Sequence, residues 1–243
     1  MTMAVESNMK RVSLELGGKS ALIVLGDADL NKATDIAQVG LFLNQGQCCC
    51  ASSRVFVHAS IYDAFLVAAK KAAEARVLGS PFEAKTSQGP QVDKLQFDKV
   101  LGYIQDGKGE GARLVTGGAS QDGKGFFIQP TIFADVTDQM KIAREEIFGP
   151  VMCVIKFDSD DEVIERANAS EFGLAAGIIS TDVPRAMRIA RNLTAGTVWI
   201  NSYDNFDAAA PFGGFKSSGH GREKGENALE SYTEIKCVMM PLA

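Results

Sequence analysis

Ala21-Leu22-Ile23-Val24-Leu25, the helical pattern of residues 29–44 and Arg54-Val55-Phe56-Val57-His58 together decide the fold class. A short apolar run bounded by glycine or polar residues is typical of a strand. In residues 29–44, Asp29 suits an N-cap and apolar residues recur at helical spacing. This strand–helix–strand order favours a parallel pair of strands with a helix between them.

The same alternation continues along the chain. Ser60 is expected to open a helix that runs to about residue 78, and Ser159 with Glu162 forms the pattern of a capping box. Further strands are predicted at residues 12–16, 113–116, 151–157, 175–179 and 197–201, with helices at 94–106, 159–168 and 183–192. Residues 235–240 are predicted to form a lone apolar strand that needs a partner edge. We therefore expect an α/β fold in which helices flank a mostly parallel sheet.

Composition excludes several functional classes. The 243 residues carry a net charge of −5 without a basic run, which argues against a nucleic-acid surface. Apolar runs are too short for a membrane span, and the first residues lack a secretory pattern. The five cysteines are odd in number and show no C-x-x-C spacing, so no metal site is expected. A reduced intracellular setting, cytoplasmic or mitochondrial, fits best.

The segment Asn44-Gln45-Gly46-Gln47-Cys48-Cys49-Cys50 offers a thiol for covalent chemistry. A thiolate is a strong nucleophile even when only a small fraction is ionised. The alternative is that the three cysteines are small buried hydrophobic residues, the usual state of a free cysteine. The polar residues before them suit a backbone that approaches a substrate. A dyad with His58 or His220, the only histidines, is less favoured but stays open.

The segment Leu14-Glu15-Leu16-Gly17-Gly18-Lys19 places a carboxylate beside two glycines. Glu15 could face water on an alternating strand, or it could be partly desolvated and serve as a general base. Residues 13–20 nearly match a phosphate-binding loop, but Ser13 replaces the first glycine and the context is an apolar strand. Residues 219–225 do not have the spacing of a dinucleotide-binding glycine motif either.

Five segments in this order resemble the NAD(P)-dependent aldehyde dehydrogenase superfamily, in the class that includes mitochondrial, cytosolic and retinal-oxidising enzymes. They are residues 14–20 and 44–50, Glu145-Glu146-Ile147-Phe148-Gly149-Pro150, Ala195-Gly196-Thr197-Val198-Trp199-Ile200-Asn201, and Pro211-Phe212-Gly213-Gly214-Phe215-Lys216-Ser217-Ser218-Gly219. The resemblance covers nearly the whole chain. It implies oxidation of aldehydes to carboxylic acids with NAD, or alternatively NADP, through a thiohemiacetal and a thioester.

The resemblance also implies a role for individual residues. Cys49 corresponds to the nucleophile and Glu15 to the base that activates water for thioester hydrolysis. The remaining implied residues are Glu146, Phe148, Gln96 and Gly17 on the cofactor side, Cys48, Cys50, Phe206 and Phe212 in the aldehyde pocket, and Glu223 as a proton relay.

In this superfamily most of the cofactor-binding domain precedes the strand of the base. The resemblance therefore predicts a remnant of that domain at residues 1–17, a catalytic domain at 18–217, a segment returning toward the cofactor domain at 218–232, and an oligomerisation strand and tail at 233–243. Expected partners are an aldehyde and other subunits, in a homo-oligomer or with full-length chains. Two alternative functions remain: a truncated chain that acts as an interaction partner, and cofactor-independent ester hydrolysis by Cys49 and Glu15.

Overall fold

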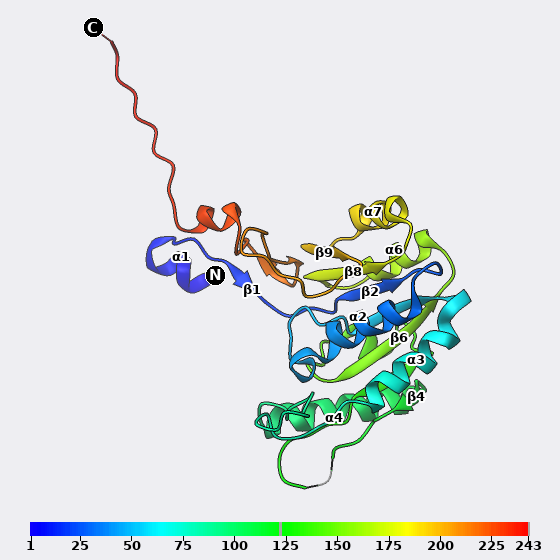
Figure 1. Cartoon of the computed structure of the whole chain (residues 1–243). Coiled ribbons are helices and arrows are strands. Elements are labelled where there is room, and N and C mark those ends of the chain that lie inside the picture. The colour runs from blue at the N-terminus through cyan, green and yellow to red at the C-terminus, as the bar shows by residue number, and fades with distance from the viewer. Residues whose placement is uncertain (122, 243) are drawn as a thin grey trace.

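A seven-stranded sheet forms the centre of the computed structural model, which describes residues 1–121 and 123–242 (Figure 1). Asp122 and Ala243, the last residue of the expected tail, lie outside the described residues. The strand order is β4-β5-β6-β3-β2-β8-β9. The bounds are Ala21–Val24 for β2, Arg54–His58 for β3, Arg113–Thr116 for β4, Thr131–Ala134 for β5, Val151–Phe157 for β6, Ala175–Ile179 for β8 and Thr197–Ile200 for β9.

The pairing confirms a mostly parallel sheet. All neighbouring strands run parallel except β4, which pairs antiparallel with β5 at one edge. Successive residues of β2 point to opposite faces: Ile23 joins one buried cluster and Leu22 joins the other. The short apolar run is therefore buried on both sides.

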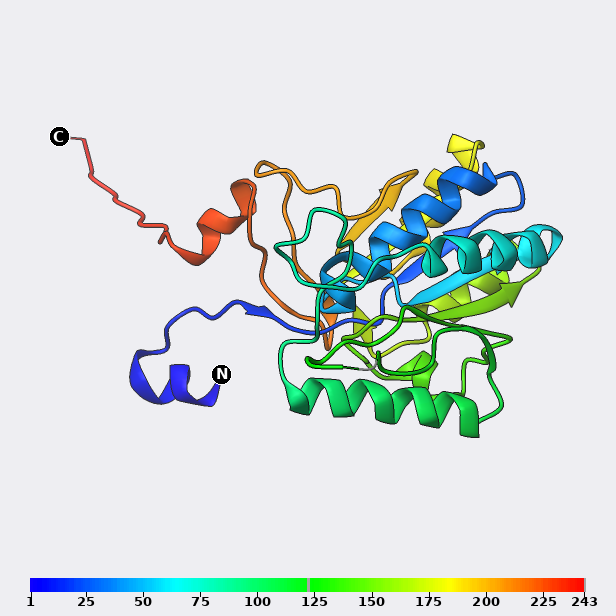
Figure 2. The same cartoon turned by 60° about the horizontal axis from the view of Figure 1, so that its bottom comes forward.

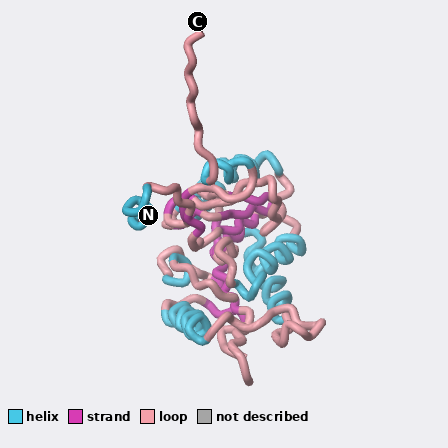
Figure 3. Tube along the Cα trace, turned by 90° about the vertical axis from the view of Figure 1, so that its left-hand side faces the viewer, coloured by secondary structure: helices cyan, strands magenta, loops and turns pink. Residues whose placement is uncertain are grey.

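Helices cover both faces of the sheet (Figure 3). Buried residues of α4, α6 and α7 contribute to one cluster, and those of α2 and α3 to the other. The bounds are Thr2–Asn8 for α1, Leu30–Phe42 for α2, Tyr62–Glu74 for α3, Lys94–Gly109 for α4, Lys141–Arg144 for α5, Asp160–Asn168 for α6 and Val183–Asn192 for α7. Among the described residues, every helix is too short or too polar to span a bilayer.

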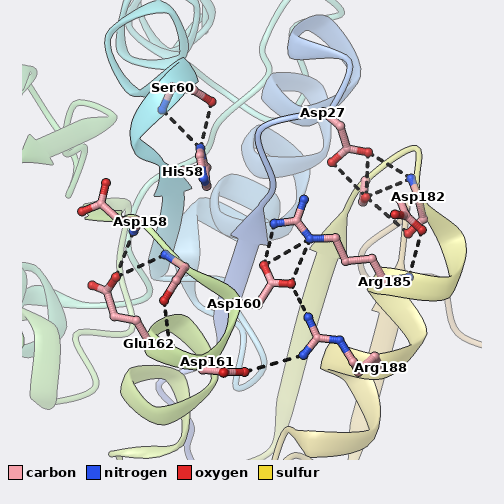
Figure 4. A network of polar contacts seen from close by, with 12 residues as sticks. Asp27, His58, Ser60, Asp158, Asp160, Asp161, Glu162, Asp182, Arg185 and Arg188 are labelled. Carbon is pink, nitrogen blue, oxygen red and sulfur yellow. Dashed lines mark hydrogen bonds and ion pairs between the residues drawn. The ribbon is translucent and has the colours of Figure 1, made fainter.

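Local capping fixes several helix starts as predicted. The Asp29 carboxylate accepts from the backbone N–H groups of residues 31 and 32, and Ser159 with Glu162 makes both bonds of a capping box. Asp160 then joins α6 to α7, because its carboxylate accepts from Arg185 and Arg188 (Figure 4). These polar contacts hold the two helices of one face together.

Other predictions were wrong in part. The third helix begins at Tyr62 and ends at Glu74; its N-cap is Ile61, because the Ser60 hydroxyl bonds to His58 instead. Strand β5 was missed, since its four residues are too few to show a period. The strand expected at residues 12–16 shrinks to β1, Leu14–Glu15.

The segment expected to form a strand at residues 235–240 is extended chain without strand pairing, and it leaves the body of the molecule (Figure 2). Ile235 is 100% exposed and Met239 is 89% exposed. A strand requires a neighbouring edge for its backbone hydrogen bonds, and none of the described residues supplies one here. The remaining short elements are β7 (Phe172–Gly173), β10 (Phe215–Lys216), β11 (Gly219–His220), η1 (Leu43–Gly46), η2 (Ala59–Ile61) and η3 (Glu226–Ser231).

Candidate active site

Three loops meet at the end of the sheet where strands β2, β3 and β6 begin. These strands are neighbours in the order β6-β3-β2 and run parallel, so the segments before them end side by side. The segments are residues 16–20, 43–53 and 145–150. Each contains one of the motifs that carry chemistry. The candidate site thus lies at the amino ends of the strands, opposite the carboxyl-end crevice that open α/β sheets commonly use.

The loop before β3 has a constrained backbone. Asn44 and Gln45 both have left-handed conformations, with φ of 49° and 48°, and Gly46 follows with φ of 77°. Non-glycine residues in this region are strained, and such strain gathers at functional sites. A Cβ on Gly46 would lie 2.2 Å from the carbonyl carbon and oxygen of Gly149. Only glycine permits this contact between the loops before β3 and β6.

The three thiols form one cluster at the end of this loop. Cys48 and Cys49 are half-buried and Cys50 is buried; the Sγ atoms of Cys48 and Cys50 lie 3.5 Å apart. Hydrogen bonds with Cys48 and Cys50 lower the pKa of Cys49, whereas hydrogen bonds with Cys48 and Cys49 raise the pKa of Cys50. Within this cluster the thiolate form is therefore favoured most at the middle sulfur, that of Cys49. Cys50 is a buried core residue, as the alternative interpretation expects, whereas Cys48 and Cys49 remain partly accessible.

Glu15 lies on β1, which pairs antiparallel with β11 so that Glu15 is opposite Gly219. Burial raises the pKa of Glu15, and the nearby carboxylate of Glu223 adds to this effect. The Glu15 charge raises the pKa of Cys49 and so partly opposes the lowering by the other two thiols. The two alternatives for Glu15 each hold in part, because its side chain is half-buried. A thiolate beside a carboxyl with a raised pKa suits acyl chemistry, in which water must be deprotonated.

Glu146 contacts the glycine pair before β2. Its Oε1 accepts a hydrogen bond of 3.0 Å from the Gly18 backbone N–H, and a Cβ on Gly17 would lie 2.2 Å from its Oε2. Burial raises the pKa of Glu146. Phe148 has a left-handed φ of 57°, and the amide of Gln96 donates to its carbonyl at 2.7 Å. Gln96 therefore positions the loop that holds Glu146 and Phe148.

Gly18 also joins the loops before β2 and β3. A Cβ on Gly18 would lie 2.7 Å from the carbonyl oxygen of Cys49. The glycine pair is thus enclosed by Glu146 on one side and by the cysteine loop on the other. The fit to a nicotinamide cofactor rests on a half-buried carboxylate, that of Glu146, which is held against the same glycine pair that contacts the Cys49 backbone.

Trp199, Phe206 and Phe212 form an aromatic cluster. The ring centroids of Phe206 and Phe212 are 5.2 Å apart, and those of Trp199 and Phe206 are 5.4 Å apart. Phe212 packs with Cys48 and Cys49 against the core. The backbone of Phe212 pairs with that of Glu223, which brings Glu223 toward Glu15. The structure thus brings Phe206 and Phe212 together and connects Phe212 to Glu223.

Asp204 belongs to this site but was missed in the sequence. It lies 3.2 Å through Oδ1 from Cys50 Sγ, and burial raises its pKa to about 6. The signal was an acidic residue between Tyr203 and Phe206, in a segment that returns from β9 to the thiols. No local period marks such a residue, because its role depends on contacts across more than 150 positions of the chain.

Two alternative interpretations are wrong. Gly18, Lys19 and Ser20 are buried and lead into a strand, whereas a phosphate-binding loop opens a helix. His58 is the last residue of β3 and lies four residues, or about 13 Å, from the first residue of that strand. Its Nδ1 bonds to Ser60 and its ring packs on Phe157. A dyad of His58 with the cysteines before that strand is therefore excluded.

Comparisons with known proteins identify the family of the chain. The family model described as "Aldehyde dehydrogenase family" matches residues 1–238. Mitochondrial aldehyde dehydrogenase of Homo sapiens is 55% identical over 235 residues, which are 97% of this chain and 46% of that protein. Retinaldehyde dehydrogenase 3 of Mus musculus is 54% identical over 239 residues, 98% of this chain and 47% of that one.

A solved structure agrees in three dimensions. The NAD⁺ complex of aldehyde dehydrogenase from Bacillus cereus superimposes with a TM-score of 0.94 at 51% identity, over 97% of this chain and 48% of that one. The chain thus spans about half the length of the relatives it matches. By sequence and by fold, the chain belongs to the aldehyde dehydrogenase family.

Proposed function

We propose that this chain oxidises aldehydes to carboxylic acids with NAD, with Cys49 as the nucleophile and Glu15 as the base. The observation that carries the proposal is the cluster in which Cys48 and Cys50 lower the pKa of Cys49 beside the partly buried Glu15. Membership of the family supports it, as does the Bacillus cereus relative, which was solved as an NAD⁺ complex.

The reaction begins at the Cys49 thiolate. Its sulfur attacks the aldehyde carbonyl carbon, a C–S bond forms, and the carbonyl oxygen takes the negative charge of a thiohemiacetal. Bound NAD, held by residues that include Glu146 and Phe148, would supply the hydride acceptor that converts the thiohemiacetal into a thioester. Glu15 then removes a proton from water; the resulting oxygen nucleophile attacks the thioester carbon, and the C–S bond breaks. The acid leaves and the Cys49 thiolate is restored.

The surrounding residues would bind and orient the reactants. We propose that the Glu146 carboxylate accepts a hydrogen bond from a hydroxyl of the nicotinamide ribose. Its position is fixed by Gly17 and Gly18. Phe148 would help place the nicotinamide ring, and Gln96, which holds that loop, would approach the ribose. Phe206 and Phe212 would line an apolar path for the aldehyde, and Glu223 would pass protons from Glu15.

Turnover of the purified chain tests the proposal. NADH formation with a simple aldehyde is measured for Cys49→Ser, Glu15→Gln and the control Cys237→Ser, which removes an exposed thiol outside the site. We expect the control to keep its activity, Cys49→Ser to fall to background, and Glu15→Gln to lose about 10²- to 10⁴-fold. Full activity of Cys49→Ser would refute the assignment.

Ester cleavage separates the thiol chemistry from cofactor binding. A chromogenic acetate ester needs Cys49 and Glu15 but no nicotinamide, so hydrolysis is expected even where NADH formation is weak. Cysteine-dependent ester cleavage without NADH formation would assign the chain the esterase activity. Equal cleavage by wild type and Cys49→Ser would refute the nucleophile in either function.

We also propose that residues 233–242 add to the sheet of another subunit. The support is their exposure without strand pairing, with Ile235 at 100% and Val238 at 81%. The experiment is analytical ultracentrifugation of the chain, alone and mixed with a full-length relative, with Ile235→Asp and Val238→Asp as the variant pair. Association that persists unchanged in the double variant would contradict the proposal.

A further inference from the structure

Cys48, Cys50 and Asp204 bring three potential metal-ligand atoms together. Among the described residues, these two sulfurs and a carboxylate oxygen lie within 4.8 Å of one another. The Sγ atoms are 3.5 Å apart, and Cys50 Sγ is 3.2 Å from Asp204 Oδ1. The C-x-C pair comes from the loop before β3, while Asp204 comes from the segment after β9. The C-x-x-C rule could not reveal this group, since its third member is distant in sequence.

Cys50 is 1% exposed, while Cys48 and Asp204 are half-buried. Among the described residues, Asp204 Oδ2 is inaccessible to solvent and has no hydrogen-bond partner, and no cationic side chain forms an ion pair with this carboxylate. A buried carboxylate oxygen without a partner is costly unless a cation or a donor faces it. The contact that Asp204 does have is the thiol of Cys50, itself a weak donor. The site therefore offers ligand atoms that suit a soft cation, and a bound cation would compensate the carboxylate.

The distances suit tetrahedral coordination. With Zn–S near 2.3 Å and Zn–O near 2.0–2.2 Å, two sulfurs around zinc are separated by about 3.8 Å, and a sulfur and an oxygen by about 3.5 Å. Two of the three observed separations are shorter by about 0.3 Å, and the third, from Cys48 Sγ to an Asp204 oxygen, is within 4.8 Å, so rotation of the side chains would admit the ion.

We propose that Cys48, Cys50 and Asp204 form a binding site for a thiophilic divalent cation such as Zn²⁺. On binding, both thiols release their protons to solvent, two S–Zn bonds and one O–Zn bond form, and no atom is oxidised or reduced. Water completes the tetrahedron. The bound ion lies beside Cys49, so binding would restrict access to that sulfur. This site goes beyond the proposed function and does not depend on it.

Metal titration of the whole chain tests the site. The background is Cys237→Ser, because that exposed thiol could bind metal by itself. Zn²⁺ affinity is measured by competition with a chromophoric chelator, and Co²⁺ is added separately to record the thiolate-to-cobalt absorption. We expect one ion per chain, a loss of at least about tenfold in affinity for Cys48→Ser, Cys50→Ser or Asp204→Asn, and weaker cobalt absorption in either serine variant.

Two matched controls define the ligands. Cys49→Ser removes the adjacent sulfur, and Cys153→Ser removes a buried thiol that bonds to the carbonyl of Ile142 outside the cluster; both should retain the affinity within about threefold, since neither supplies a ligand. Binding that survives both Cys48→Ser and Cys50→Ser, or that is lost equally in Cys49→Ser, would overturn the proposal, as would the absence of binding. Circular dichroism checks folding, and the half-buried Cys48 supplies the test where the buried Cys50 variant does not fold.

Discussion

Lys19 is a buried base whose replacement should stabilise the fold. Its side chain is 1% exposed, and among the described residues its Nζ has no hydrogen-bond partner. Burial lowers the pKa of Lys19 to about 8, while the buried Cys153 and the carboxylates of Glu146 and Glu145 partly oppose this effect. Holding the ammonium charged at neutral pH therefore costs free energy. Lys19→Met keeps the length of the side chain and removes the charge.

The pKa gives the size and the sign of the effect. A fall from the ordinary value of 10.5 to about 8 corresponds to a cost near 3 kcal/mol at pH 7, at 1.4 kcal/mol per pH unit. Above pH 8 the unfolded chain binds more protons than the folded chain, so this cost shrinks as pH rises toward 10.5. We expect Lys19→Met to gain about 1–3 kcal/mol at pH 7, and the gap to wild type to narrow by about 2 kcal/mol by pH 9.5.

The difference in unfolding free energy between Lys19→Met and wild type is measured by urea unfolding at pH 7 and pH 9.5. Unfolding is monitored by the fluorescence of the single tryptophan and by circular dichroism. Lys32→Met is the control, because Lys32 is exposed on α2. It should change stability by less than about 0.5 kcal/mol at either pH. A Lys19→Met protein less stable than wild type at pH 7, or one whose gain is the same at both pH values, would refute the reasoning.

Three further substitutions test the loops and the edge of the sheet. Gly46→Ala should cost at least about 2 kcal/mol in urea unfolding, because the left-handed φ and the 2.2 Å approach to Gly149 both disfavour a Cβ; a cost below about 0.5 kcal/mol would mean that the loops separate freely. Tyr203→Phe should cost about 1–2 kcal/mol, because its hydroxyl donates to the buried Cys50 carbonyl at 2.8 Å; an unchanged urea midpoint would contradict this. Hydrogen bonds from residues 180–182 lower the pKa of Asp27, so its contribution is present above the ordinary Asp pKa and is lost as pH falls through the lower folded value. Asp27→Asn should thus be less stable than wild type at pH 7 and should approach it in acid, and a gap that widens on acidification would count against the assignment.

The sequence predicts well what is decided locally. Asp29 and Ser159 cap their helices as expected, because each cap depends on residues two or three positions away. Apolar runs such as β3 have the predicted bounds. Sheet order is different: nothing local states that β6 lies beside β3, or that β8 lies on the far side of β2. For the same reason Asp204 was missed, although the residues that carry recognisable motifs were found.

The closeness of the three loops, rather than the motifs alone, creates the site. The thiols, Glu15 and Glu146 lie on separate segments, and the adjacent positions of β6, β3 and β2 bring these segments to the same end of the sheet. At that end the backbones approach so closely that Gly18 and Gly46 could not carry a side chain. A protein interior transmits such displacement because it is densely packed. A methyl group at Gly18 should therefore reduce catalysis by moving the Cys49 carbonyl, even though Gly18 has no reactive group, whereas a substitution on the exposed face of α2 should not.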